Sequence, residues 1–264
     1  MVNQEQNRIT TVLPGDDLTY INSKNSSKKA IKLGTGLLYD ASSKKITATL
    51  AGRLHHRSST NTYYILTNHK RYIPKVNDRI IAIVEERLGD YFRVSIPHSS
   101  TGSALLPTIA FEGATKRNRP NLQHGDVVYA RVNVCHIKEM EPEISCVIMS
   151  SESDGGASKK DWMTDEGTYG QLKGGSLINI STGLAMELLH PSNVVLECLE
   201  KSQIPFEICI GVNGLVWVNA PRPEYTVLVL NAVQNSAVMT EEQVRGMVHS
   251  LVKTVADTLE DDDE

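Results

Sequence analysis

Hydrophobic and polar residues alternate along two central segments of the chain, a pattern typical of strands with one buried face. Every second residue is apolar in Tyr91–Ile96, and Val127–Val134 follows the same rule. Shorter apolar segments lie at Ile80–Val84, Ala104–Ile109 and Glu143–Met149. Five short strands arranged in this way predict a five-stranded Greek-key barrel of the OB type.

The segments before this barrel predict a small all-β domain. Short β-forming stretches between Ile31 and Tyr72 are separated by glycine and polar turn residues. Residues 1–30 are polar and predict an arm or loop. We therefore expect an N-terminal β domain with a flexible arm at residues 1–72 and the OB-type barrel at residues 73–152.

After the barrel, a polar linker at residues 150–165 precedes a mixture of strand and helix patterns. Strands are predicted at Leu177–Ile180, Phe206–Ile210 and Leu215–Val218, and helices at Thr182–Leu189, Asn193–Lys201, Pro223–Gln234 and after the Thr240 capping box. These elements predict an α+β domain at residues 153–259, so the fold class is mixed and multidomain. The acidic residues 260–264 predict a solvated tail, because like charges repel.

Charge is distributed unevenly along the chain. The formal net charge is −4, yet residues 1–69 carry 9 Lys/Arg against 4 Asp/Glu, and residues 70–131 carry 10 against 6. Residues 132–264 carry 8 Lys/Arg against 21 Asp/Glu. A basic front half and an acidic back half suit a protein that contacts a polyanion with one side only.

The composition is that of an ordinary globular protein, with 40% hydrophobic and 22% charged residues. No apolar run reaches the ~20 residues that a membrane-spanning helix needs, and the polar N-terminus argues against a signal peptide. The four cysteines form no C-x-x-C pair. We therefore expect free thiols in a reducing compartment.

The strongest local charge signal is the segment Lys116-Arg117-Asn118-Arg119-Pro120, which lies between two predicted barrel strands. OB barrels bind nucleic acid through such loops and the adjacent strand face, where cations neutralise phosphates. Pro120 restricts the chain after Arg119 and indicates a shaped loop. A solvated surface cluster without a binding role is an equally good interpretation of the spacing alone.

Aromatic and cationic residues also share the strand faces opposite the predicted core. Tyr91 and Arg93 occupy this face on one strand, and Tyr129 and Arg131 occupy it on another. They could stack bases and hold phosphates, or they could pack against a neighbouring domain. Because only 5% of the residues are aromatic, backbone and shape recognition is favoured over base-specific recognition.

Gly211-Val212-Asn213-Gly214 matches the G-x-x-G loop with which KH domains clamp a nucleic-acid backbone. A KH clamp joins two helices, whereas strand patterns flank this loop on both sides. Asn-Gly between two strand patterns predicts a tight type I′ hairpin, in which Asn213 and Gly214 both have positive φ. The hairpin is favoured over the clamp, and Trp217 is then a core residue whose indole N–H needs a partner.

No catalytic or metal-binding motif is present. The eight histidines form no H-E-x-x-H pattern, and neither G-x-S-x-G nor a P-loop occurs. The acidic residues do not form the spaced pairs of a two-metal nuclease. We expect no catalytic residues, no metal, no cofactor and no small-molecule substrate.

Three longer stretches resemble the S1-type OB domain of RNA exosome cap subunits: Lys70–Asp78, Lys116–Pro120 and Gly125–Val132. Phe206–Val218 resembles the KH-domain signature of the same family, while Val12–Asp16 and Gly34–Leu37 fit its N-terminal β domain. The resemblance covers roughly residues 12–255. One departure is Ala104–Pro107, which lacks the histidine that many S1 domains place there, so the basic loop is favoured as the RNA contact.

This resemblance implies a non-catalytic RNA-binding subunit in the nucleus, the nucleolus and the cytoplasm. Three such cap proteins stabilise a six-membered ring of RNase-PH-like subunits and guide single-stranded RNA through its channel to a separate exonuclease. The partners implied are RNA, ring subunits and other cap subunits, and no membrane. The motif of Gly211, Asn213 and Gly214 is structural in this family, and we expect Trp217 to be structural with it, as a core residue. Phosphate contacts are expected from Lys116, Arg117, Arg119 and Arg131, with weaker support for Tyr91 and Arg93.

Two alternatives remain at this point. The first is a free-standing RNA adapter, for example in translation. The second is an exoribonuclease with the same appended domains, which is disfavoured because the three modules account for the chain.

Overall fold

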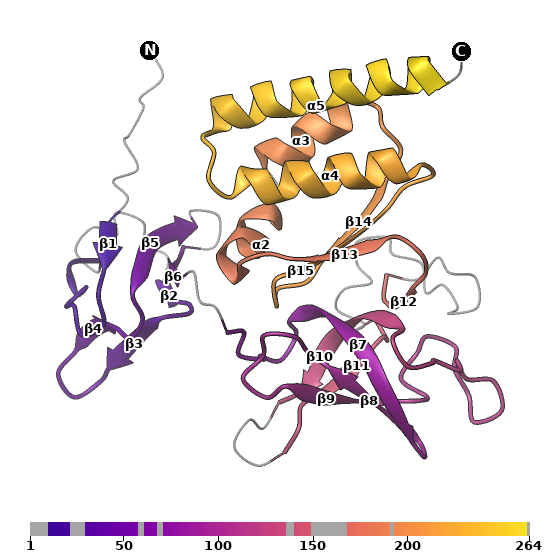
Figure 1. The fold of residues 1–264 in the computed structure, drawn as a ribbon. Coiled ribbons are helices and arrows are strands. Elements are labelled where there is room, and N and C mark those ends of the chain that lie inside the picture. Colours follow the sequence, from indigo (N-terminus) through magenta and orange to yellow (C-terminus); the bar gives the residue numbers. More distant parts are fainter. Residues whose placement is uncertain are drawn as a thin grey trace. The chain divides into compact units, whose positions relative to one another are not determined.

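The structure is a computed structural model, and Figure 1 shows its fold. It describes the residues in seven ranges: 10–21, 30–57, 61–67, 71–135, 140–148, 168–190 and 193–262. The chain divides into two compact units, residues 1–69 and residues 70–264.

Strands make up most of the described residues of the first unit, as predicted, and Tyr20 and Ile21 are helical. Four strands form one sheet in the order β1-β5-β6-β2, and β3 pairs with β4 in a hairpin. The bounds are β1 Thr10–Val12, β2 Lys32–Leu33, β3 Leu37–Asp40, β4 Lys45–Ala48, β5 Gly52–Arg57 and β6 Thr62–Leu66. Alternate residues of the sheet, such as Val12 and Ile65, share one core with Ile46 and Ala48 of the hairpin.

The predicted polar arm is wrong for residues 10–21. β1 pairs with β5, and Leu18 and Ile21 are buried in the core of the first unit. These few apolar residues stand isolated among polar ones, so they form no periodic pattern in the sequence. They are nevertheless sufficient for a core of this size. The rest of the predicted arm, residues 1–9 and 22–29, lies outside the described residues.

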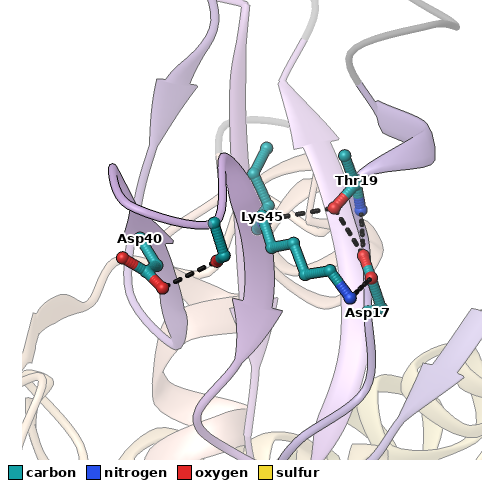
Figure 2. A network of polar contacts seen from close by, with 6 residues as sticks. Asp17, Thr19, Asp40 and Lys45 are labelled. Atoms are coloured by element: carbon teal, nitrogen blue, oxygen red, sulfur yellow. Dashed lines mark hydrogen bonds and ion pairs between the residues drawn. The ribbon is translucent and has the colours of Figure 1, made fainter.

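A network of polar contacts joins the segment after β1 to β4 (Figure 2). Asp17 accepts hydrogen bonds from the backbone and the hydroxyl of Thr19, and its Oδ2 lies 3.3 Å from Lys45 Nζ. Thr19 Oγ1 in turn accepts from the Ile46 amide at 3.2 Å. The Thr19 hydrogen bonds, followed by Lys45, lower the pKa of Asp17 because they favour the charged carboxylate.

The second unit begins with the barrel, and all five predicted strands are confirmed. Their bounds are β7 Arg79–Leu88, β8 Tyr91–Ser95, β9 Ser103–Pro107, β10 Val127–Val134 and β11 Glu143–Ser145. The strand order β11-β9-β8-β7-β10 closes into a barrel because β10 also pairs with β11. The alternating residues Phe92, Val94, Val128 and Val132 fill its core.

One strand of this sheet has no clear signal in the sequence. β12, Gly170–Leu172, pairs with the first half of β10. β11 pairs with the second half of the same edge of β10. Three residues are too few to show a period-two pattern. The predicted linker before it, residues 150–165, lies outside the described part of the chain.

The α+β domain packs helices on one face of a three-stranded sheet with the order β13-β15-β14 (Figure 1). The bounds are β13 Ser176–Asn179, α2 Thr182–Leu188, α3 Val194–Lys201, β14 Glu207–Ile210, β15 Leu215–Asn219, α4 Pro223–Ser236 and α5 Glu241–Asp262. Ser181, rather than Thr182, caps α2, and Asn193 caps α3. At the capping box before α5, the Thr240 amide donates to Gln243 Oε1 at 2.9 Å.

The predicted acidic tail is wrong at its start. Helix α5 continues through Asp262, so residues 260–262 extend it instead of leaving it. The helix is already established by the apolar stripe that begins at Val244, and Ala256 and Leu259 are good helix formers that carry it forward. Residues 263–264 lie outside the described residues.

Strand β15 connects the barrel to the α+β domain. Leu215 and Trp217 belong to the hydrophobic core of the barrel, while Val216 and Val218 belong to the core beneath the helices. Since successive side chains of a strand point to opposite faces, one strand contributes to two cores. This double burial explains why the segment is continuously apolar instead of alternating.

The first testable consequence concerns the turn between β3 and β4. Asp40, which Figure 2 labels, accepts hydrogen bonds from the hydroxyls of Ser42 and Ser43, both at 2.6 Å, and these contacts lower its pKa to about 2. A lowered pKa stabilises the folded state above the usual carboxyl pKa, and this stability is lost as the pH falls through the folded value.

The change to make is Ser42→Ala together with Ser43→Ala. We expect the Asp40 carboxyl to stay largely ionised well below its usual pKa of 3.8 in the parent chain, and its pKa to rise toward that value in the double variant. An NMR titration of the Asp40 carboxyl carbon over the acidic pH range measures the pKa in the parent chain and in the double variant. Equal midpoints in the two proteins would show that the serine hydroxyls do not hold the charge.

Candidate functional site

The G-x-x-G loop is a hairpin turn between β14 and β15, as predicted, but its type differs from the prediction. The Gly214 amide donates to the Gly211 carbonyl at 3.0 Å, and the Gly211 amide donates to the Leu215 carbonyl at 2.8 Å. Gly214 has a φ of +83°, whereas Val212 and Asn213 are not among the residues with positive φ. This is a three-residue loop with a type I turn and a following left-handed glycine, so the type I′ prediction is wrong.

The side chain of Asn213 explains the difference. Its Oδ1 accepts from the Ile81 amide at 3.2 Å, and its Nδ2 donates to the Ile81 carbonyl at 2.8 Å. The side chain is therefore committed to the barrel, and Asn213 is only 1% exposed. The Val212 amide adds a hydrogen bond to the Arg79 carbonyl at 2.9 Å.

These contacts occupy an open edge of β7. The pairing of β7 with β8 begins at Ile83, so none of the described strands pairs with the edge at residues 79–81 on that side. Unpaired backbone groups are costly when they are buried. The loop supplies the missing donors and acceptors, which is why it lies against β7 and is closed to a nucleic-acid backbone in this structure.

The two glycines of the loop are required because neighbouring backbone atoms lie too close to them for a side chain. A Cβ on Gly211 would lie 2.8 Å from the Ile81 amide nitrogen, and a Cβ on Gly214 would lie 2.5 Å from the Ile180 carbonyl oxygen. Trp217 is a core residue as predicted, and its indole N–H donates to the Gly174 carbonyl at 2.9 Å. Gly211, Asn213, Gly214 and Trp217 therefore form one structural junction.

The basic loop lies between β9 and β10 and exposes two of its three cations. Lys116 and Arg117 are exposed. A small turn shapes the loop, because the Thr115 amide donates to the Asn118 carbonyl at 2.8 Å. Pro120 is buried and fixes the chain that follows.

Arg119 has a different position from the other two cations. Its Nη1 lies 2.9 Å from Asp90 Oδ1 and donates to Thr108 Oγ1 at 3.1 Å. Asp90 lies in the β7–β8 turn, directly before Tyr91. Arg119 thus connects the basic loop to the turn that precedes β8.

Tyr91 and Arg93 lie on the outer face of β8, as predicted. Tyr91 is 42% exposed, while the side chain of Arg93 lies 3.0 Å from Glu86 Oε1. This ion pair reduces the positive charge that Arg93 offers to a phosphate. Arg87, which no sequence pattern indicated, donates to Asn121 Oδ1 at 3.2 Å. Asn121 directly follows the basic loop, Lys116–Pro120.

Of the two interpretations of Tyr129 and Arg131, the structure favours packing over an open binding face. They are 9% and 4% exposed, and Arg131 Nη1 donates to Asn77 Oδ1 at 2.9 Å. Tyr129 packs against Tyr169, whose ring centroid lies 5.5 Å away. Alternation shows which residues share a face, but it does not show that a later segment covers this face. Arg131 is therefore not available for a phosphate contact in this structure.

A cavity of about 330 Å³ lies where the barrel meets the α+β domain. Its lining includes Tyr129, Tyr169, Trp217, Lys173 and Glu207. One acid and one base offset each other there, so the charge of the cavity does not favour an anionic ligand. The sequence contained no signal for it, because its walls come from separate segments.

The described residues offer little for redox or metal chemistry. Within them, no group of three or more His, Cys, Asp or Glu side chains could hold a metal ion. Burial raises the pKa of the Cys146 thiol, and it raises the pKa of Cys209 to about 11. In the part of the chain that the structure describes, no helix has the length and hydropathy to cross a membrane.

Comparison with known proteins agrees with this architecture. Residues 31–71 match the model described as the exosome complex exonuclease Rrp40 N-terminal domain, residues 72–157 match the S1 domain of exosome complex component RRP40, and residues 175–224 match a KH domain. The exosome complex component rrp40 of Schizosaccharomyces pombe is 35% identical over 95% of this chain and 98% of its own. The chain belongs to the Rrp40 family of exosome complex components.

The Rrp40 family extends to animals. The RRP40 of Homo sapiens is 32% identical over 89% of this chain and 80% of its own length. A solved structure described as a putative exosome complex RNA-binding protein has the same fold over 71% of this chain and 96% of its own, with a TM-score of 0.50 at 16% identity. The predicted resemblance to exosome cap subunits, specifically ribosomal RNA-processing protein 40, is confirmed.

Replacing Asn213 tests the junction. Asn213→Ala leaves the Ile81 amide and carbonyl without partners, and we expect it to lower the free energy of unfolding by about 2–4 kcal/mol. Asn235→Ala, at an exposed position of α4, is the matched control and should change the stability by less than about 0.5 kcal/mol. Chemical denaturation measures both. A loss as small as that of the control would contradict the role assigned to Asn213.

The thermal stability of single-residue variants distinguishes the paired cation Arg119 from the exposed cation Lys116. Arg119→Ala removes the contacts with Asp90 and Thr108 and should cost about 1 kcal/mol. Lys116→Ala removes only an exposed side chain and should leave the thermal midpoint unchanged. Thermal unfolding of the two variants decides this. The assignment fails if Lys116→Ala is the more destabilising change.

Proposed function

We propose that this chain is a non-catalytic cap subunit of the RNA exosome that guides single-stranded RNA with the barrel. One observation supports this most strongly: the G-x-x-G loop is committed to β7, while Lys116 and Arg117 are exposed on a shaped loop. The family is one of exosome components with S1 and KH domains. The RNA contact is therefore assigned to the barrel and not to the KH-type loop.

The proposed contact surface runs from the basic loop to β8. Lys116 and Arg117 supply the charges for phosphates, and the Arg119–Asp90 pair joins their loop to the turn that precedes Tyr91. Tyr91 can stack on one base, since every base has a π face. Arg93 contributes less, because Glu86 shares its charge. Such a surface binds RNA through backbone and shape, without a preference for sequence.

The proposed partners follow from the same family. They are single-stranded RNA, the RNase-PH-like ring subunits and the other cap subunits, and the proposal includes no membrane, cofactor or small-molecule substrate. Two exposed cations make few phosphate contacts, so the isolated chain should bind RNA weakly and gain affinity in the assembled complex. We propose the nucleus, the nucleolus and the cytoplasm as its locations.

A free-standing adapter is the second candidate, and the match to exosome components over most of the chain does not favour it. The mass of the native complex distinguishes the two. A cap subunit co-purifies with a ring of other subunits, and an adapter does not.

The charge reversal Lys116→Glu plus Arg117→Glu tests the proposed contact. With a fluorescein-labelled oligouridine of about 20 nucleotides, we expect weaker binding and a salt dependence reduced by about 1.4 in the slope of log K against log salt, roughly 0.7 for each lost phosphate contact. The readout is fluorescence anisotropy over a series of salt concentrations. Gel analysis of the RNA after incubation with phosphate or Mg²⁺ reports any cleavage by the chain.

The matched control is Arg245→Glu plus Lys253→Glu, which makes the same change of net charge at exposed positions of α5. If the control weakens binding as much as the loop variant, the effect is one of net charge. In that case, or if the loop variant binds normally, the assignment of the RNA contact to this loop is wrong. Degradation of the RNA by the purified chain would contradict the non-catalytic role.

A further inference from the structure

The four-stranded sheet of the first unit has two faces with different chemistry. The strand register places Val12, Leu54 and Ile65 on the inner face, together with Leu33 and Tyr63. These residues pack against the β3–β4 hairpin in the core of the unit. The opposite, outer face includes Thr11, Lys32, Arg53, His55, Thr62, Tyr64 and Leu66.

Aromatic side chains occupy the centre of this outer face. His55 on β5 and Tyr64 on β6 lie directly opposite each other in the register, and β5 and β6 are the two central strands. Their ring centroids are 5.7 Å apart with an interplanar angle of 22°, so the rings are stacked. Neither residue belongs to the hydrophobic core of the unit.

Positive charge surrounds this pair. Arg53 and Lys32 are both exposed, on a central strand and on an edge strand respectively. The four strands contain no Asp or Glu. Among the residues named for the outer face, Leu66 is the one aliphatic side chain.

We propose that this outer face is a second contact for single-stranded RNA, with His55 and Tyr64 stacking on unpaired bases and Arg53 and Lys32 contacting phosphates. Aromatic residues on the central strands of a four-stranded sheet are a general means of binding splayed bases, and cations at its margin hold the backbone. This inference rests on the proposed function, because it names a further site on the same RNA-binding chain.

The test uses the full chain and the labelled oligouridine described above. His55→Ala plus Tyr64→Ala should weaken binding about tenfold, in line with the loss of stacking on roughly one base. Arg53→Glu should weaken it as well, and Arg53→Lys should restore most of the affinity. His56→Ala is the control, because His56 stacks on Tyr63 on the face of these strands that is opposite to the proposed contact.

Circular dichroism and thermal unfolding establish that each variant is folded. If the double aromatic variant unfolds, Arg53→Glu and Arg53→Lys still test the face, since an exposed arginine does not affect the core. The prediction for the fully combined variant, with the basic loop also reversed, is weaker binding than for either set alone.

The outcomes separate this inference from the proposed function. Normal binding by the sheet variants, with weak binding by the loop variant, overturns the inference and leaves the proposed function intact. Normal RNA binding by both the sheet variants and the loop variant contradicts the inference and the proposed function. Sheet variants that bind RNA normally but fail to assemble with ring subunits would identify a protein-docking face, which also overturns the inference.

Discussion

The second unit depends on a pair of hydrogen bonds between the side chain of Asn213 and the backbone of Ile81. Strand β7 extends beyond its partner β8, and its free edge would otherwise bury unpaired groups. The amide of asparagine carries both donor and acceptor groups, as a neighbouring strand would offer. Through it, the hairpin of the KH-type domain is attached to the edge of β7, and β15 can place residues in two cores at once.

This junction also decides where RNA can be bound. A loop that pairs with β7 cannot at the same time clamp a nucleic-acid backbone, so the G-x-x-G sequence serves close packing here. The exposed cations of the basic loop and of the outer sheet face all lie in the first half of the chain. The uneven charge along the sequence therefore has a structural counterpart: the basic half presents these surfaces, and the acidic half carries the loop that packs against β7.

The sequence predicted most elements because their periodicity is local. The alternation of Tyr91–Ile96 and the helical stripe after Thr240 depend only on neighbouring residues, and both are confirmed. The predictions that were wrong concern features that depend on segments far apart in the chain. Arg131 is buried and donates to Asn77, a residue far earlier in the chain, and Asn213 has negative φ because distant Ile81 sets the turn. No local pattern contains this information, although the family resemblance did assign the loop a structural role.

The most direct test of this account is an amide chemical-shift map of the full chain during titration with oligouridine. We predict that the backbone amides of Lys116 and Arg117 shift, while the side-chain amide of Asn213 and the backbone amide of Gly214 stay unchanged. Their fixed resonances would show that the junction persists when RNA is bound. Larger shifts at Gly211–Gly214 than at the basic loop would contradict the account, because the loop would then act as the clamp.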